Sequence, residues 1–156
     1  MKIQIRRAKL EDIKEIKILT KKLLHYNYKN FDKTINVNWT AQYTKEIKDA
    51  IKKTNSIALI ALDKEKVVGY FIGRIEQAES YKNIKKIAEA QEAYITKNYR
   101  RKNIGTLFLK EFFKWAKSKK VKRARAVISS GNKKSINWNK RNGFKDYDVV
   151  LERDLN

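Results

Sequence analysis

The sequence has no cysteine and no proline, and it has one histidine, His25, among 156 residues. Without cysteine there are no disulfides, no thiolate metal ligands and no thiol nucleophile. A lone histidine has no second imidazole with which to hold a metal ion, so we expect no metal cofactor. Long apolar runs are missing as well, because none approaches the roughly 18 residues of a membrane-spanning helix.

The charged start MKIQIRRAKLEDIKEIK also lacks the apolar centre of a signal peptide. We therefore expect a cytoplasmic protein with no membrane partner. Hydrophobic residues make up 42% of the chain, which is enough to form a core despite 35% charged residues. The length is typical of one domain, and we expect residues 1–156 to form one.

Acidic residues are scarce beside basic ones, with 17 against 38 lysines and arginines and a net charge of +21. The excess is greatest from Lys97 to Arg125, a segment that we call the basic pole. It carries twelve cationic residues and one acid, Glu111. A solvated surface explains such a run most simply. Two other roles stay open: non-specific association with nucleic acid or the ribosome, and attraction of a phosphate-rich ligand.

Hydrophobic periodicity predicts alternating strands and helices. Strands are expected near Ile3–Arg7, at 87–96, at 121–129 and at 147–152, and residues 56–76 read as a hairpin around the turn at 63–66. Helices are expected at 10–26, 39–53 and 132–142. The strongest helix begins near Ile104, with apolar residues at helical spacing on one face: Ile104, Leu107, Phe108, Phe112, Trp115 and Ala116.

The loop before this helix is a candidate anion site. A helix N-terminus presents unpaired backbone N–H groups that can hold a phosphate. Hydrogen bonds to a charged group contribute about 1.5–3 kcal/mol each, more than the typical 0.3–1 kcal/mol of the helix dipole, so the amides should dominate. On spacing alone, a basic loop that merely leads into a helix explains the pattern equally well.

A stretch of roughly 50 residues, YITKNYRRKNIGTLFLKEFFKWAKSKKVKRARAVISSGNKKSINWNKRNGF, resembles the core of the GNAT superfamily of acyl-CoA-dependent N-acetyltransferases. That family's acyl-CoA loop reads Q/R-x-x-G-x-G/A, and here Arg100 to Gly105 occupy it, with Asn103 in place of the first glycine. Downstream, Asn132 and the stretch ending at Phe144 are similar to a later family segment. Asn139 stands there at the position of the tyrosine that serves many members as a general acid.

The resemblance implies an α/β (α+β) GNAT fold, in which a mixed, mostly antiparallel sheet with splayed central strands is flanked by about four helices. It also implies transfer of an acetyl group from acetyl-CoA to a primary amine by direct attack in a ternary complex. The acceptor, a small-molecule amine or a protein or peptide amine, stays unidentified. The sequence also does not distinguish a monomer from a homodimer.

The resemblance further implies the residues that contact coenzyme A. Backbone amides from Arg101 to Thr106 would hold the pyrophosphate, and the backbones of Ala93 and Ile95 would pair with the pantetheine. The Ile95 N–H would act as the oxyanion donor. The full set of cofactor-binding residues is Ala93, Ile95, Arg100, Arg101, Lys102, Asn103, Ile104, Gly105, Thr106 and Asn132.

A protonated amine needs a general base before it can attack, and the predicted strand at 87–96 supplies two carboxylates. Simple alternation places Glu89 on the same face as Gln91, Ala93 and Ile95, so Glu89 is the expected base. A bulge in this strand would invert the alternation and favour Glu92 instead. At Asn139 the usual acid is missing, and its role as a site residue is left open.

Two further functions are not excluded by the sequence. One is a basic nucleic-acid- or ribosome-associated protein built on a GNAT scaffold, whose binding would weaken steeply as salt rises. The other is a non-catalytic coenzyme A-binding sensor, which the substitutions at Asn103 and Asn139 would favour if they reflect loss of catalysis.

Overall fold

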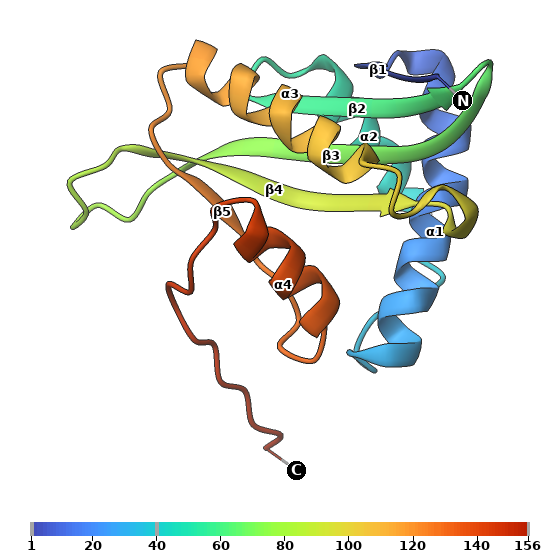
Figure 1. Ribbon diagram of the computed structural model, residues 1–156. Helices are drawn as coiled ribbons and strands as arrows, with labels where there is room; N and C mark the ends of the chain where they lie inside the picture. The colour runs from blue at the N-terminus through green and yellow to red at the C-terminus, as the bar shows by residue number, and fades with distance from the viewer. Residues whose placement is uncertain (1, 40, 156) are drawn as a thin grey trace.

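The computed structural model describes residues 2–39 and 41–155 and contains a five-stranded sheet in the order β1-β2-β3-β4-β5. The first four strands are antiparallel neighbours, and β5 runs parallel to β4. Figure 1 shows the sheet as the central layer of the molecule. The strands are β1 (Ile3–Arg7), β2 (Ser56–Asp63), β3 (Lys66–Gln77), β4 (Lys86–Ile95) and β5 (Ala124–Ala126).

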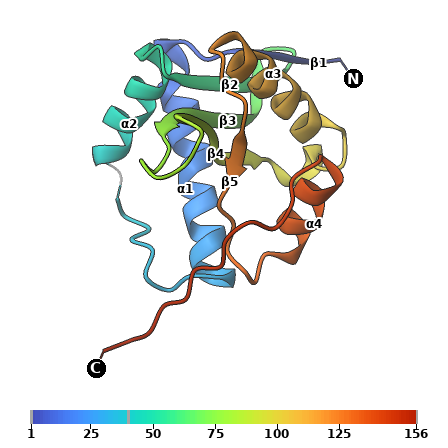
Figure 2. The same ribbon diagram turned by 90° about the vertical axis from the view of Figure 1, so that its left-hand side faces the viewer.

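Helices cover both faces of this sheet. Figures 1 and 2 show α1 (Ile13–Asn30) and α2 (Ala41–Lys52) on one face, and α3 (Ile104–Ser118) and α4 (Lys133–Arg141) on the other. Short 3₁₀ turns at Leu10–Asp12 and Lys97–Tyr99 precede α1 and α3. The mixed sheet and the four α-helices confirm the expected fold class.

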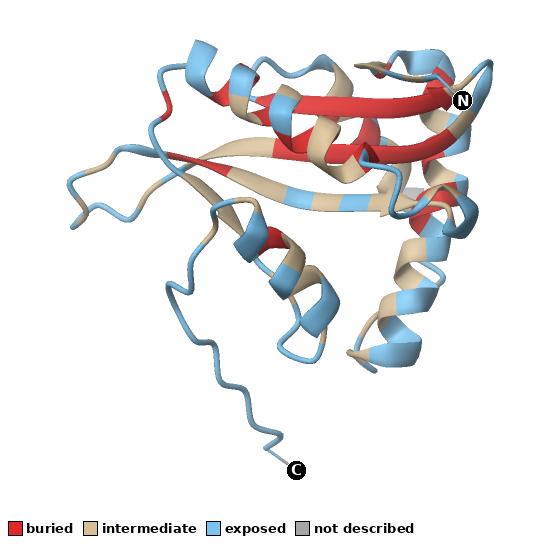
Figure 3. Cartoon of the chain, viewed as in Figure 1, coloured by how far each residue is buried: buried red, intermediate tan, exposed pale blue. Residues whose placement is uncertain are grey.

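Strand β2 is buried on both faces, which explains why its sequence is continuously apolar rather than alternating (Figure 3). Its residues Ile57 and Leu59 pack toward α3, whereas Ala58 and Ile60 pack toward α1 and α2. The predicted apolar face of α3 is confirmed except at Leu107, which is only partly buried; the buried members are Ile104, Phe108, Phe112, Trp115 and Ala116. Burying each large apolar side chain contributes about 1.5–3 kcal/mol.

The predicted strand at 147–152 is wrong. Residues 144–155 form no regular element. Phe144 packs against Phe113, and Tyr147 contacts Arg123 and Lys82, after which the chain leads away from the body of the protein (Figures 1 and 2). Val149, Val150 and Leu151 are 85%, 78% and 90% exposed. Alternating apolar residues show which side chains would share a face, but a strand also needs a partner to pair with, and none lies beside this segment in the described part of the chain. Strand β5 is likewise shorter than the predicted 121–129.

Candidate active site

Strands β4 and β5 separate after a short paired region. They are partners at three positions only, Ala88 with Ala124, Glu89 with Arg125 and Ala90 with Ala126. Beyond Ala90, β4 continues to Ile95, and no described strand pairs with it on that side. The expected splay is therefore present, and it leaves one backbone edge of β4 available for hydrogen bonds.

The direction of the backbone amides along this edge follows from one hydrogen bond. The Thr96 N–H donates to the Val68 carbonyl of β3 at 2.9 Å. Because successive amides of a strand point to opposite sides, the N–H groups of Ala93 and Ile95 point away from β3, toward the open edge. The Ile95 carbonyl on that edge accepts a hydrogen bond from Arg100 Nε at 2.9 Å.

A bulge interrupts β4 midway. Gly73 of β3 lies opposite Ala90, while the preceding Ile72 lies opposite Glu92, so Gln91 is the extra residue. The expected alternation, with Glu89 on the face of Ala93 and Ile95, is therefore wrong. The bulge reverses the faces, and Glu89 and Glu92 both lie on the α1/α2 side of the sheet.

The core contacts agree with this assignment. Ile95 packs against the cluster beneath α3, together with Ala88 and Ala90. Tyr94, the neighbour of Ile95, packs against the cluster beneath α1 and α2. Ala90 and Ile95 can share a face across five positions of β4 only if one residue between them is out of register.

Glu89 is engaged in an ion pair with its partner on β5. The Arg125 guanidinium donates to Glu89 Oε2 through Nη2 at 2.6 Å and through Nε at 2.9 Å. Both side chains are partly buried. The Glu89 carboxylate is therefore occupied by the Arg125 guanidinium through two charge-assisted hydrogen bonds.

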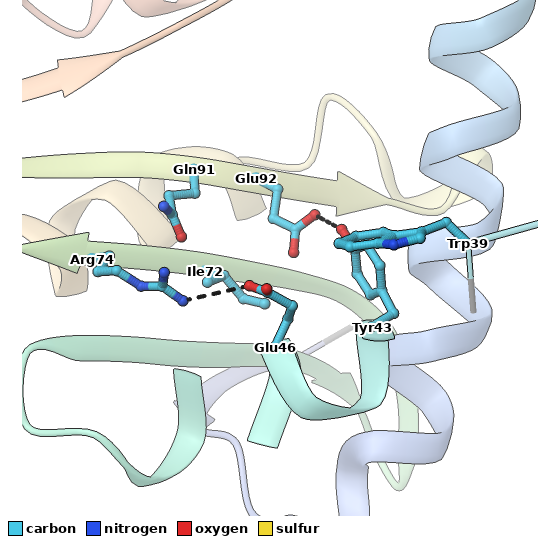
Figure 4. A pocket seen from close by; sticks show the side chains of 7 residues that line it. All are labelled: Trp39, Tyr43, Glu46, Ile72, Arg74, Gln91 and Glu92. Atoms are coloured by element: carbon cyan, nitrogen blue, oxygen red, sulfur yellow. Dashed lines mark hydrogen bonds and ion pairs between the residues drawn. The ribbon is translucent and has the colours of Figure 1, made fainter. Parts of the chain in front are cut away.

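Glu92 lies in a different environment, shown in Figure 4. Its Oε2 accepts a hydrogen bond from the Tyr43 hydroxyl at 2.5 Å and a weaker one from the Tyr70 hydroxyl at 3.3 Å. Thr20 Oγ1 in turn donates to the Tyr70 hydroxyl at 2.9 Å. Burial raises the pKa of Glu92, and the two phenol hydrogen bonds only partly oppose that rise.

The two phenols stay protonated because their own pKa values are raised. Burial is the main cause for both Tyr43 and Tyr70, and the nearby Glu92 charge adds to it. Glu92 is therefore a carboxyl group that retains its proton to higher pH than an ordinary glutamate and is oriented by two neutral donors. This is the environment in which proteins place general bases.

Glu92 borders a cavity of about 180 Å³ between β3, β4 and α2. The lining residues are Trp39, Tyr43, Glu46, Ile72, Arg74, Gln91 and Glu92. Sequence reasoning missed Tyr70 and Arg74, both on β3. Both residues could have been noticed, because each places a polar group in a mostly aliphatic strand. Periodicity, however, does not show whether such a side chain faces the core or a cavity.

The loop before α3 contains two non-glycine residues with a left-handed backbone conformation. Asn103 is the N-cap of α3 and has φ 63°, in the left-handed region that glycine favours, and Arg101 has φ 61°. Asparagine tolerates this region better than most residues, so Asn103 can replace the first glycine of the family loop. Arg100, Arg101 and Lys102 are exposed on this loop.

Gly105 opens the first turn of α3, next to α4. A Cβ atom there would lie 2.8 Å from Trp138 Cζ2, so the glycine allows the two helices to pack closely. Ile104 is buried at the same turn, whereas Thr106 is partly buried. Gly105 thus serves the packing of α3 against α4 as well as the loop.

Asn132 and Asn139 both interact within α4. Asn132 Oδ1 accepts a hydrogen bond from the Ser135 N–H at 3.1 Å and caps the helix. Asn139 is 7% exposed, and its Nδ2 donates to the Ser135 carbonyl at 2.9 Å. Where the family has a tyrosine acid, this chain thus has a buried amide that is hydrogen-bonded to its own helix.

The basic pole lies at the surface, since its cationic residues other than the partly buried Arg125 are exposed. In the described part of the chain, no group of three or more histidine or acidic residues has the arrangement of a metal site. None of the described helices is both long and apolar enough to cross a membrane.

A sheet that splays between β4 and β5, next to a loop with left-handed residues at the start of α3, is the arrangement of the GNAT class of acyltransferase fold. Residues 22–144 match the model of the Acetyltransferase (GNAT) family, and the chain belongs to that family. No curated protein matches the sequence.

Solved structures share this fold at low sequence identity. A tetramutant of a Bacillus halodurans protein is 17% identical with a TM-score of 0.86, covering 97% of this chain and 99% of its own. A predicted acetyltransferase with acetyl-CoA from Clostridium acetobutylicum is 19% identical with a TM-score of 0.81, covering 99% and 97%. An aminoglycoside 6'-N-acetyltransferase from Acinetobacter haemolyticus is 14% identical with a TM-score of 0.78, covering 98% of both chains.

Proposed function

We propose that the protein is an N-acetyltransferase that moves the acetyl group of acetyl-CoA to a primary amine by direct attack in a ternary complex. The observation that carries this proposal is the position of Glu92. It lies on β4 next to the open backbone edge, faces a cavity and has a raised pKa. Family membership and a solved neighbour with acetyl-CoA support the choice of donor.

Coenzyme A is assigned to the open edge and the loop. The amides of residues 101–106 hold the pyrophosphate, and the exposed cations of the loop attract it. The backbones of Ala93 and Ile95 pair with the pantetheine in place of a neighbouring strand. The Ile95 N–H donates to the thioester oxygen and stabilises the negative charge that develops on it.

Glu92 replaces Glu89 as the proposed general base. It accepts a proton from the bound ammonium, which frees the nitrogen lone pair. The amine nitrogen then attacks the acetyl carbonyl carbon to form a tetrahedral intermediate whose nitrogen carries a positive charge. The C–S bond breaks to release coenzyme A as a thiolate, and the surplus proton on nitrogen passes to this thiolate or to water, which leaves the neutral amide. Glu89 is less suited to this step because Arg125 already holds its carboxylate.

The departing thiolate needs little help from an acid. An alkyl thiol with a pKa near the ~8.5 of cysteine leaves tolerably as the thiolate. Asn139 cannot donate a proton usefully, and its amide is already bonded to Ser135. We therefore propose that Asn139 does not act as the general acid and that water or the phenol of a tyrosine protonates the thiolate instead.

The test compares two matched variants with one accepted amine. Glu92→Gln should lower kcat by about 10²–10⁴, the usual contribution of general base catalysis. The affinity for acetyl-CoA, measured by calorimetry, should stay nearly unchanged. Glu89→Gln should keep kcat within about tenfold of the parent protein, a smaller loss than removal of a general base causes. The opposite ranking of the two variants would return the role of base to Glu89.

A further inference from the structure

Arg74 has too few partners for its position. Its Nη2 lies 3.8 Å from Glu46 Oε2, beyond hydrogen-bond range, and its Nε is buried without a partner. Among the described residues, no hydrogen bond from this side chain is present. The Nε donor is buried, and a buried donor without an acceptor costs free energy. This cost indicates that the group has an acceptor when the site is occupied.

A second buried polar atom beside Arg74 also lacks a hydrogen-bond partner. Ser56 of β2 lies directly opposite Arg74 in the sheet, and its buried Oγ also has no hydrogen-bond partner. Native proteins leave few buried polar atoms without hydrogen bonds. Two such atoms on adjacent strands therefore indicate that a polar group from outside the protein completes their hydrogen bonds.

The position of Arg74 relative to Glu92 suggests what the acceptor is. Ile72 lies opposite Glu92, and Arg74 follows two residues later on the same face of β3. Such diagonal neighbours in antiparallel strands are about 7–8 Å apart at Cα. Figure 4 shows the Arg74 guanidinium on one side of Glu92 and the rings of Trp39 and Tyr43 on the other. One small molecule in this cavity can therefore contact the Arg74 guanidinium, the Glu92 carboxyl group and the two aromatic rings together.

We propose that the acceptor of the proposed acetyl transfer is an amine that also carries a carboxylate, that is, an amino acid. Arg74 holds the carboxylate through a bidentate pair of hydrogen bonds, which guanidinium and carboxylate geometries match. Glu92 takes the proton of the amine, and the apolar part of the acceptor lies against Trp39 and Tyr43. An acceptor with an ammonium in place of the carboxylate would bring that charge beside Arg74, where Glu46 of the same cavity already pairs with the guanidinium.

The experiment uses pairs of acceptors that differ only in the carboxylate: L-phenylalanine with 2-phenylethylamine, and L-lysine with cadaverine. At saturating acetyl-CoA, the parent protein should prefer the amino acid of each pair in kcat/KM by at least about 10-fold. Arg74→Gln should raise KM for the amino acid by about 10–100-fold, as expected from the loss of charge-assisted hydrogen bonds. It should leave KM for the decarboxylated amine and for acetyl-CoA unchanged.

Two further variants make the result specific. Arg123→Gln removes the same charge from an exposed position outside the cavity and should leave the preference intact. Arg74→Lys keeps the charge but loses the planar fork, so it should restore the preference only in part. Equal use of both members of each pair by the parent protein, or an unchanged preference in Arg74→Gln, would overturn the assignment.

Calorimetry separates this inference from the proposed function on which it rests. L-phenylalanine should bind to the coenzyme A-loaded parent protein and not detectably to Arg74→Gln. If it binds through Arg74 but no acetyl group is transferred to any amine, the proposed function fails and the assignment of Arg74 stands. If 2-phenylethylamine is acetylated as well as L-phenylalanine, the assignment fails and the function stands.

Discussion

Replacing Glu92 with glutamine should stabilise the protein at pH 8 while it removes activity. The folded state raises the pKa of Glu92, mainly through burial, so folding disfavours the carboxylate form. Glutamine is neutral and similar in shape, and its carbonyl oxygen can accept the same hydrogen bonds from Tyr43 and Tyr70. The substitution thus removes the electrostatic cost and keeps the contacts.

The sign of the pH dependence follows from the direction of the shift. Between the ordinary glutamate pKa of about 4.3 and the raised value, the folded state binds more protons than the unfolded state. The stability of the parent protein therefore falls as pH rises through this window, and Glu92→Gln escapes that loss. Each unit of raised pKa corresponds to about 1.4 kcal/mol, and each kcal/mol shifts Tm by about 2–4 °C at this chain length.

Thermal unfolding followed by circular dichroism from pH 4.5 to 8.5 measures this difference. The Tm of Glu92→Gln should exceed that of the parent at pH 8 and converge with it toward pH 4.5. Glu89→Gln is the matched control, because it breaks an ion pair with Arg125 and should lower the free energy of unfolding by about 0.5–1 kcal/mol. A lower Tm for Glu92→Gln at pH 8 would refute the assigned environment of this carboxyl group.

Four other outcomes are expected. Asn103→Gly should keep the affinity for acetyl-CoA in calorimetry, whereas Asn103→Val should weaken it by about tenfold, since φ 63° costs about 1–2 kcal/mol for a β-branched residue that lacks the local hydrogen-bonding capacity of asparagine. Asn139→Ala should change kcat by less than about tenfold but lower Tm, because it removes the Nδ2 hydrogen bond to the Ser135 carbonyl and empties a buried position; a hundredfold loss of kcat would give Asn139 a direct catalytic role. Ending the chain at Phe144 should lower the free energy of unfolding by no more than about 2 kcal/mol, since the removed residues are exposed and make only surface contacts, Tyr147 with Arg123 and Lys82 and Asp146 with Lys140; a larger loss would mean that they pack more extensively in solution. Acetyl-CoA turnover should persist as salt rises, while any nucleic-acid binding by the basic pole, followed by fluorescence anisotropy, should weaken steeply.

Local patterns in the sequence are sufficient to predict most of the helices and strands and the loop that precedes α3. The apolar face of α3 repeats at helical spacing, and helix formation depends on neighbours three and four residues apart, so its prediction was confirmed. The stretch from Arg100 to Gly105 was placed at the start of a helix for the same reason. Its resemblance to the family loop and the family match to residues 22–144 agree.

Only the tertiary structure decided which carboxylate faces the cavity. The bulge at Gln91 is a property of how β4 pairs with β3, so no pattern within β4 alone could reveal it. The environment of Glu92 is non-local as well, since Tyr70 and Tyr43 are 22 and 49 residues away along the chain. Periodicity indicates which residues share a face of one strand, but the partner strand sets the register, and the register determines which of two similar glutamates lies at the site.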